Sequence, residues 1–584
     1  MNLKSSRDPG TALPLGLEQG PRRHLSFTRV DLISLIIIAS AAMALLLPLF
    51  LSRFPDGVDA KYHYRWSYYF CEALREGTLY PRWLAGASRG YGSPTMFYYP
   101  PLPFYVVAGF NLIAPNLLLA IKLSCALSMV LSGVTMYFFS RTMLARPGSL
   151  VAAVTYMLAP YHIFELCRVG ALSEFWSFVW IPLVFDAVRR LAGGEGWRAS
   201  AYLALSYALL IFTHVPTSLI VALILPVYLL VLTRDKGALV KGAGGIALGV
   251  GLSAIFFVSV LFETRYVRID HVLSRMRKKT FLFEDFSAIS WTNLLSAADY
   301  HYPEGNLKEA NLVAISLALL FVVASLILWV RRKSVELNLA PQARSLWLVA
   351  LISLLMTTRL TEILWSSIRP LQYLDKPVRW LVPATAATFL LTAIAASAVS
   401  RTRERRVLYA VPLILAIAFN LAISAHVATQ EAVEPGELEE ELGSKDVREY
   451  SPIWWNEQFH RELEDFPLVV NNGQAMVLAI DDAGLKQSYQ VTAATPATLR
   501  FRSLYFPGWV ARIDGSRVDV QRSTEGNIQI GVEPGEHNIT LRFELTWTHI
   551  TARTVSAVSI LILAAMFYSN RLRNKKAGPR RRIA

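Results

Sequence analysis

Three side chains that could do chemistry follow the first apolar segment closely: Asp56, Asp59 and His63. Residues 60–76 carry aromatic side chains at amphipathic spacing, which predicts a helix lying on a bilayer surface. Asp59 stands at its start, and His63 lies one turn further along the same face. Such a pair could share a metal ion, although one i,i+4 pair is a weak signal. Two simpler interpretations stay open, in which Asp59 caps the helix and Asp56 belongs to a Pro-Asp-Gly turn.

The composition indicates a membrane protein. The chain has 584 residues, of which 54% are hydrophobic and 17% are charged, and its mean hydropathy is +0.38. Soluble globular chains carry about a quarter charged residues. Disordered chains, collagen, small disulfide scaffolds and a single soluble core are therefore excluded. The formal net charge of +15 would suit nucleic acid, but the placement of the basic residues argues against such a partner.

Apolar runs long enough for a bilayer recur along the chain, and we predict about twelve spans. The first is expected to be an uncleaved anchor, because residues 1–30 show no signal-peptide pattern. The run at 345–358 is the weakest, since Arg359 and Glu362 follow it closely. The predicted spans are residues 32–51, 117–140, 148–164, 175–188, 199–213, 215–233, 242–262, 312–330, 345–358, 380–400, 407–425 and 554–570.

The apolar stretch at 102–114 is short for a span, and the positive-inside rule decides how it is read. If it does not cross, nearly all the basic clusters fall on one side; if it crosses, every cluster after the first moves outside. We therefore expect an interfacial helix on the outer surface and both termini in the cytoplasm. The clusters are Arg22/Arg23, Arg141/Arg146, Arg189/Arg190/Arg198, Arg234/Lys236/Lys241, Arg331/Arg332/Lys333, Arg401/Arg403/Arg405/Arg406 and the tail from Arg571 to Arg582.

This topology gives a domain plan. Residues 1–30 are a cytoplasmic tail, 31–425 form the transmembrane domain with outer loops 52–116 and 263–311, and 549–570 with the basic tail 571–584 close the chain. Residues 426–548 are an outer segment that opens with an acidic linker. Alternation of Ile539 and Leu541 with Asn538 and Thr540, together with turn signals such as Pro534-Gly535, predicts a small β-sandwich there. Three scattered cysteines give neither a disulfide framework nor a metal motif.

The first outer loop carries a family resemblance. Its Asp-x-x-x-His, followed by GTLYPRWLAGASRGYGSPTMFYYPPLPFY, resembles bacterial membrane proteins labelled 6-pyruvoyl-tetrahydropterin synthase-related and the wider GT-C superfamily of lipid-linked glycosyltransferases. Supporting stretches are LAPYHIFELCRVGALSEFWSFVWIPL, THVPTSL at 213–219 and LQYLDKPVRWLVP at 371–383. The pterin label looks like a misnomer, because that enzyme is soluble and its histidine zinc site has no match here. The C-terminal FPGWVARIDG and VEPGEHNITLRF are similar to outer β-domains of large bacterial membrane proteins.

The resemblance implies roles for particular residues. GT-C enzymes take a sugar from a polyprenyl phosphate on the outer face, and an acidic residue at the start of the first-loop helix activates the acceptor. Asp59 stands at that position, and Asp56 or Glu174 could supply the second acidic group, whose usual adjacent form is missing here. A divalent metal ion, Mg²⁺ or Mn²⁺, is often nearby, with Asp59 and His63 as its expected ligands.

Phosphate binding would need arginine, because a guanidinium directs two donors onto two oxygens. The outward candidates are Arg82, Arg168 and Arg379. A charged side chain in a surface loop is usually just solvated. Arg168 and Arg379 stand out because each lies beside the end of a span, where an ion is costly and usually functional.

The leading hypothesis is a multi-pass glycosyltransferase of the inner (plasma) membrane. It would move a sugar from a polyprenyl-phosphate-linked donor to a glycan, lipid or protein acceptor on the outer face. The alternative is a non-enzymatic transporter or assembly protein for envelope polysaccharide. Transporters tend to show inverted repeats and broken helices at the midplane, and the sequence shows neither clearly.

Overall fold

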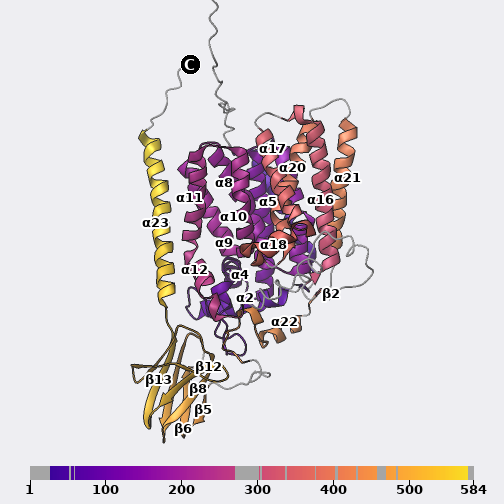
Figure 1. Cartoon of the computed structure of the whole chain (residues 1–584). Helices are drawn as coiled ribbons and strands as arrows, with labels where there is room; N and C mark the ends of the chain where they lie inside the picture. The colour runs from indigo at the N-terminus through magenta and orange to yellow at the C-terminus, as the bar shows by residue number, and fades with distance from the viewer. Residues whose placement is uncertain are drawn as a thin grey trace, which may run out of the picture.

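The structure, a computed structural model, describes residues 27–576 except 52–53, 58, 270–300, 303–304, 336–338, 375, 401–405, 429–431, 434, 457–467 and 482–483. Most of the predicted N-terminal tail and the end of the basic tail lie outside the described residues. Figure 1 shows a body of roughly parallel helices with a smaller β-structure beyond one end, and a long C-terminal helix that runs back beside the body.

Each of the twelve predicted spans falls on a helix or a broken helix. Eight helical segments are long and apolar enough to cross a membrane, or up to ten if two bent pairs are counted as single spans. The remaining two predictions fall on α8 (Leu172–Ala192) and α9 (Trp197–Thr213), which are more polar or shorter. The eight segments are Arg29–Leu51, Leu117–Arg141, Arg146–Val169, Val215–Leu232, Glu309–Val330, Pro377–Val399, Val407–Ala428 and Trp547–Tyr568.

One predicted continuous span, residues 242–262, is broken, which corrects the sequence reading. α11 (Lys236–Leu252) and α12 (Ala254–Phe262) meet at an angle of 82°. The last helix, α23 (Trp547–Lys576), supports this break: Ser556 Oγ accepts the Ile255 N–H at 2.8 Å and donates to the Leu252 carbonyl at 3.0 Å. A break inside a bilayer is tolerated where a neighbouring side chain satisfies the freed backbone groups.

The second break follows the weakest predicted span. α17 (Ala340–Leu355) is followed by a segment, Arg359–Ser367, that turns by 89° and contains α18 (Glu362–Ser367). Trp365 donates its indole N–H to the Met356 carbonyl at 3.2 Å, so this buried carbonyl at the end of α17 has a partner. The charged residues after position 358 thus mark a sharp turn.

Two short helices lie at the end of the body nearest the β-structure (Figure 1). They are α2 (Ala60–Arg75) and α4 (Leu102–Ile113). α4 has 12 residues, so at 1.5 Å per residue it extends about 18 Å, well short of a hydrocarbon core of about 30 Å. Its length favours the interfacial placement, which stays a prediction.

The C-terminal β-structure is a sandwich of two antiparallel sheets, as the alternation predicts. One sheet has the order β10-β9-β13-β7-β6 and the other β11-β12-β8-β5, and side chains of both, such as Ile539 and Phe501, share one core. The strands are β5 (Leu468–Asn472), β6 (Ala475–Asp481), β7 (Lys486–Ala493), β8 (Ala497–Leu504), β9 (Trp509–Ile513), β10 (Ser516–Val518), β11 (Gln521–Arg522), β12 (Asn527–Val532) and β13 (Gly535–Phe543).

The sandwich is joined to the first outer loop. The Leu504 N–H donates to the Tyr91 carbonyl at 2.8 Å, and Trp83 stacks on Phe543 with ring centroids 5.8 Å apart. Trp83 and Phe97, both from the loop, belong to the core of the sandwich. The outer domain and the loop therefore form one packed unit.

Candidate functional site

Asp59 is held at the start of α2 by its backbone. Its N–H donates to the Val169 carbonyl at 2.9 Å. Gly57 lies so close to the same turn that a Cβ there would come within 2.5 Å of the Val169 carbonyl carbon. Gly170, with φ of +69°, approaches Ala60 equally tightly. Small residues on both sides thus bring the start of α2 against the second outer turn.

The carboxylate of Asp59 does not cap α2. The residue occupies the N-cap position, but its side chain makes no capping hydrogen bond. The side chain is partly exposed and has no hydrogen bond or ion pair with any residue that the structure describes. The capping interpretation is therefore wrong for Asp59, and its carboxylate is available to a ligand.

His63 has a hydrogen-bonding partner at each ring nitrogen. The Leu172 N–H donates to its Nδ1 at 2.9 Å, and its Nε2 lies 2.8 Å from the Tyr99 hydroxyl. The same Leu172 N–H also donates to the Gly170 carbonyl at 3.0 Å, so the imidazole packs against this turn and contacts Tyr99 on its other side. The ring is 2% exposed. Burial lowers its pKa to about 4, against the opposing charge of Asp59.

This geometry changes the expected metal role of His63. A neutral imidazole binds a metal through a lone pair, and both ring nitrogens of His63 already lie within hydrogen-bond distance of protein groups. Within the described ranges no group of three or more His, Cys, Asp or Glu side chains could hold a metal ion. His63 is therefore placed to orient its neighbours, and Asp59 is the residue of the expected pair with free ligand atoms.

Glu174 lies in the first turn of α8, at the centre of a buried polar cluster. It is 5% exposed, and Tyr161 donates its hydroxyl to Oε1 at 2.8 Å. Arg379 Nε lies 3.3 Å from Oε2, and His214 Nε2 lies 3.8 Å from the same oxygen. Arg379 also donates to the Leu374 carbonyl at 2.7 Å, so its guanidinium is oriented from two directions.

The structure groups some of the predicted site residues and separates others. Glu174 and Arg379 form an ion pair, and the charge of Asp59 acts on both Glu174 and His63. Arg168 instead pairs with Glu309 at 2.8 Å, and Arg82 donates to the Ile255 carbonyl at 3.0 Å while stacking over Tyr80. Asp56 is exposed, with Lys61 as its nearby charge. Neither Arg168 nor Arg82 is aimed at the Glu174 cluster.

Sequence reasoning missed Tyr99, Lys376 and Asp446. Tyr99 stands in an aromatic run that reads as a membrane belt, and only the position of His63 singles it out. Lys376 lies three residues before Arg379, and its charge acts on His214. Asp446 is an acidic residue of the linker without a local motif, so no sequence signal marks it.

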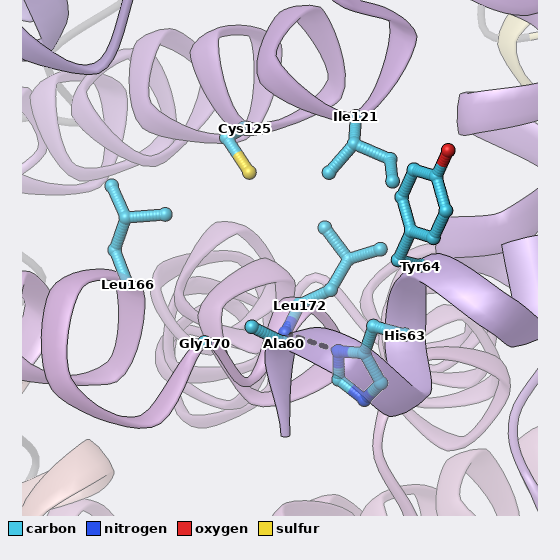
Figure 2. A pocket seen from close by; sticks show the side chains of 8 residues that line it. All are labelled: Ala60, His63, Tyr64, Ile121, Cys125, Leu166, Gly170 and Leu172. Atoms are coloured by element: carbon cyan, nitrogen blue, oxygen red, sulfur yellow. Dashed lines mark hydrogen bonds between the residues drawn. The ribbon is translucent and has the colours of Figure 1, made fainter. Parts of the chain in front are cut away.

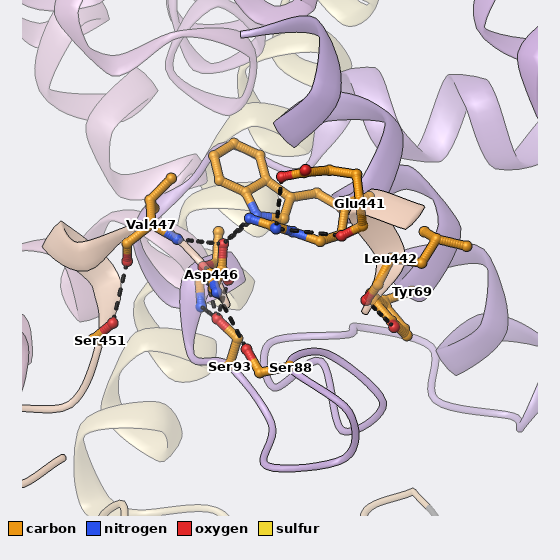
Figure 3. A network of polar contacts seen from close by, with 11 residues as sticks. Tyr69, Ser88, Ser93, Glu441, Leu442, Asp446, Val447 and Ser451 are labelled. Carbon is orange, nitrogen blue, oxygen red and sulfur yellow. Dashed lines mark hydrogen bonds and ion pairs between the residues drawn. The ribbon is translucent and has the colours of Figure 1, made fainter. Parts of the chain in front are cut away.

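Asp446 anchors the linker to α2, in the network that Figure 3 shows. Its Oδ1 accepts from Arg65 at 3.1 Å and from the Trp66 indole at 2.8 Å. Its Oδ2 accepts from Thr95 at 2.6 Å and also from Ser93. Upstream, the linker helix α22 (Pro435–Leu442) lies against α2. Glu437 forms an ion pair with Lys61, and Glu441 forms one with Arg65. The first part of the outer segment thus belongs to the first loop rather than to the sandwich.

A small apolar recess lies behind His63 (Figure 2). His63 and Tyr64 line it from α2, and Cys125 lines it from α5 (Leu117–Arg141). Apart from those two rings its walls are aliphatic, with one thiol. The full lining is Ala60, His63, Tyr64, Ile121, Cys125, Leu166, Gly170 and Leu172. The recess is therefore a mostly apolar hollow beside the imidazole.

Comparisons with known proteins give one family and several distant similarities. A family described as the 6-pyruvoyl-tetrahydropterin synthase related domain, a membrane protein, matches residues 96–429. An uncharacterized protein of Lactococcus lactis subsp. cremoris is 24% identical over 238 residues, which are 39% of either chain.

Two solved proteins have a similar arrangement. The apo oligosaccharyltransferase of Archaeoglobus fulgidus matches 72% of this chain and 60% of its own, with a TM-score of 0.45 and 14% identity. The same enzyme has been solved with an inhibitory peptide and a dolichol-phosphate, with a TM-score of 0.45 at 15% identity. A mycobacterial arabinofuranosyltransferase matches 70% of this chain and 28% of its own, with a TM-score of 0.44 and 16% identity.

These structural similarities carry no argument about activity, because their TM-scores lie below 0.5 and the chain spans under two thirds of each protein. The family match is different in kind, since it covers more than half of this sequence. The chain belongs to the family of membrane proteins described as 6-pyruvoyl-tetrahydropterin synthase related.

Proposed function

We propose that the protein is a membrane glycosyltransferase that moves a sugar from a polyprenyl-phosphate-linked donor to an acceptor on the outer face of the membrane. One observation carries the proposal: Asp59 has no side-chain partner among the described residues, and its charge acts on a buried Glu174 that is paired with Arg379. A free base next to an oriented guanidinium suits transfer to a hydroxyl with a departing phosphate.

The residues divide the reaction between them. Asp59 takes the proton from the acceptor hydroxyl while the oxygen of that hydroxyl bonds to the anomeric carbon of the donor sugar. The bond from that carbon to the phosphate oxygen breaks, and the electron pair leaves with the polyprenyl phosphate. Arg379 balances the charge on the departing phosphate, and Glu174 with the Leu374 carbonyl holds the guanidinium in place. A divalent ion, Mg²⁺ or Mn²⁺, bound at Asp59 would supply further charge for the phosphate.

Surface chemistry fits the arrangement better than passage through the bilayer. α2, α4 and the linker lie together at one end of the body, beside the sandwich (Figure 1). Both broken helices have their freed groups satisfied by neighbouring side chains.

The test is lipid analysis of a deletion strain that carries either the wild-type protein or Asp59→Asn at equal membrane abundance. The proposal expects a polyprenyl-linked sugar to accumulate, and an outer polymer or lipid to lose that sugar, in the deletion and in Asp59→Asn. A deletion that loses an envelope polysaccharide without accumulating lipid-linked sugar, and that Asp59→Asn restores fully, would favour the transporter or assembly role.

A further inference from the structure

Arg82 is a buried cation without an ion-pair partner among the residues that the structure describes. It lies in the first outer loop and is 6% exposed. Its Nη2 donates to the Ile255 carbonyl at 3.0 Å, and its guanidinium lies over the ring of Tyr80, 4.6 Å from the centroid. Its Nε is buried and has no hydrogen-bond partner among the described residues. An unpaired buried charge is strongly destabilising, so an anion is expected beside this guanidinium.

A second arginine approaches the same helix break from the last helix. Figure 1 shows α23 beside α12, and Ser556 of α23 accepts the Ile255 N–H at 2.8 Å. Arg553 lies one turn before Ser556, and residues three apart are neighbours on a helix surface. The side chain of Arg553 is exposed and has no partner among the described residues. The backbone of Ile255 thus links two arginines that lie far apart in the sequence.

The acidic residue that acts on Arg82 is engaged elsewhere. Glu263, at the end of α12, is buried, and its two carboxylate oxygens lie 3.2 and 3.3 Å from Nε2 of His549. Burial lowers the pKa of Arg82, and the charge of Arg553 lowers it further. Tyr80 and Glu263 act in the opposite direction. The electrostatics therefore agree with the contacts, because Arg82 has a second cation near it and no carboxylate paired with it.

The position of the two arginines suits a lipid headgroup. Arg553 directly precedes the predicted span 554–570, at the end of α23 that adjoins the sandwich (Figure 1). Trp547, at the start of the same helix, is exposed, and tryptophan is typical of a membrane–water interface. Leu261 and Phe262, at the end of α12, are exposed too, and their apolar side chains suit contact with acyl chains. A phosphate at this depth is one that a membrane lipid carries.

We propose that Arg82 and Arg553 together bind the headgroup phosphate of an anionic phospholipid at the break between α11 and α12. Guanidinium groups bind phosphate oxygens through parallel N–H donors, and basic residues near a membrane surface favour anionic lipids. The phosphate supplies the counter-charge that Arg82 lacks and holds the first outer loop against the last helix. The site shares no residue with the Glu174 cluster, so this inference goes beyond the proposed function.

The first test counts the lipids that the purified full-length protein retains when it is released from lipid nanodiscs into a mass spectrometer. The nanodiscs contain equal amounts of phosphatidylglycerol and phosphatidylcholine with the same acyl chains. Wild-type protein should retain phosphatidylglycerol preferentially. Arg553→Gln should lower that preference about fivefold, because it removes one cation at the membrane surface. Arg553→Lys keeps the charge and should lower the preference less.

The control replaces another exposed arginine. Arg369, in α19 (Arg369–Gln372), is also exposed and has no partner among the described residues. Arg369→Gln changes the net charge by the same amount as Arg553→Gln but leaves the break untouched. It should therefore retain the wild-type preference for phosphatidylglycerol, which separates a local site from a general effect of charge.

A charge reversal places a carboxylate where the phosphate is expected. In Arg553→Glu the new side chain can pair with Arg82, so the protein should be at least as stable as wild type in detergent without phospholipid. Added phosphatidylglycerol should raise the thermal midpoint of wild-type protein and leave that of Arg553→Glu unchanged. This variant distinguishes loss of lipid binding from loss of folding.

Three results would overturn the proposal. An equal preference for phosphatidylglycerol in wild-type protein and Arg553→Gln would remove Arg553 from any lipid site. A rise of the thermal midpoint with inorganic phosphate as large as that with phosphatidylglycerol would indicate a site for free anions. Retention of undecaprenyl monophosphate in preference to phosphatidylglycerol, lost in Arg553→Gln, would assign the site to the polyprenyl lipid. The proposed function is tested separately by sugar transfer in Asp59→Asn, so either proposal can fail alone.

Discussion

Two acidic residues at the same short helix, α2, differ in how their carboxylates are engaged. Asp446 reaches α2 from the linker with a side chain that is 4% exposed, and both of its oxygens accept several hydrogen bonds. Asp59 stands at the start of α2 with a partly exposed side chain and no partner among the described residues. The first carboxylate is saturated and the second is open.

The difference indicates a structural role for Asp446 and a chemical role for Asp59. A buried charge is stable only when its hydrogen-bonding capacity is filled, and a filled carboxylate has no lone pair to offer a proton. Asp446 therefore fixes Arg65, Trp66 and the loop around Ser93 in relation to one another. Asp59 keeps its lone pairs for a ligand, while its backbone alone is fixed by the Val169 carbonyl. The hydrogen bonds of Asp446 hold this region together, and the Asp59 carboxylate is not needed for that purpose.

Breaking the saturated carboxylate should have the largest effect. Asp446→Ala leaves Arg65, whose side chain is 1% exposed, buried without this partner. Removing one member of a buried charged pair costs about 3–5 kcal/mol. We expect a strong fall in membrane abundance and in the thermal unfolding midpoint of the purified protein, with faster proteolysis of the linker.

The matched control for Asp446 is Glu437, which lies in the same linker. Glu437 bonds to Lys61 at 3.2 Å, but both side chains are substantially exposed. Glu437→Ala should therefore change stability by less than about 1 kcal/mol. Equal shifts in the two variants would mean that Asp446 is no more structural than a surface charge, and the comparison would fail.

Changing the open carboxylate should reduce turnover and leave folding intact. Asp59→Asn removes the proton acceptor but makes no buried group lose a partner. Loss of a general base typically lowers a rate by about 10²–10⁴-fold. The measurement is sugar transfer at equal membrane abundance, with Asp56→Asn as the exposed control that should stay near the wild-type rate. Normal turnover in Asp59→Asn, or a loss shared equally by Asp56→Asn, would move the catalytic role elsewhere.

Much of this contrast could be predicted, because it depends on local pattern. The interfacial helix from Ala60, the candidate Asp59 and the alternation of Ile539 with Thr540 in β13 all follow from periodicity. The break at Ser253 could not be read, because Ser556 of α23 supports it from some 300 residues away. Asp446 was missed for the same reason: its partners Arg65 and Ser93 lie more than 350 residues earlier in the chain.

The helix-cap interpretation of Asp59 fails for a physical reason that sequence does not contain. A cap side chain must turn back onto the first N–H groups of the helix. Whether it does so depends on the backbone that docking against Val169 and Gly170 imposes. Arg168 shows the same limit, because only the fold reveals that Glu309 occupies it.

A smaller effect is expected from Arg379, whose guanidinium is paired with Glu174. Arg379→Lys keeps the positive charge but loses the two parallel N–H donors of the guanidinium, so one of two directed bonds to phosphate disappears. We expect the affinity for undecaprenyl monophosphate to fall about tenfold. The measurement is nanodisc binding, and Arg168→Lys, whose partner is Glu309, is the matched control that should change little. An affinity unchanged in Arg379→Lys would mean that binding is not bidentate.

The smallest effect concerns the imidazole that ties α2 to the second outer turn, and it shows in the pH dependence of stability. Burial lowers the pKa of His63 to about 4, below its usual value of 6.5. A histidine whose pKa is lower in the folded protein binds protons more readily in the unfolded chain. The contribution of His63 to the free energy of unfolding is therefore fully present above pH 6.5 and is lost as the pH falls toward 4. Protonation of Nδ1 would also set two donors, the ring and the Leu172 N–H, against each other. The thermal midpoint of the purified protein should therefore fall by several degrees between pH 7 and pH 4.5, and by less in His63→Gln, which has no proton to gain. The same change of thermal midpoint with pH in both proteins would show that acid destabilises this region through another group. The hydrogen bonds of His63 would then contribute less to stability than those of Asp446.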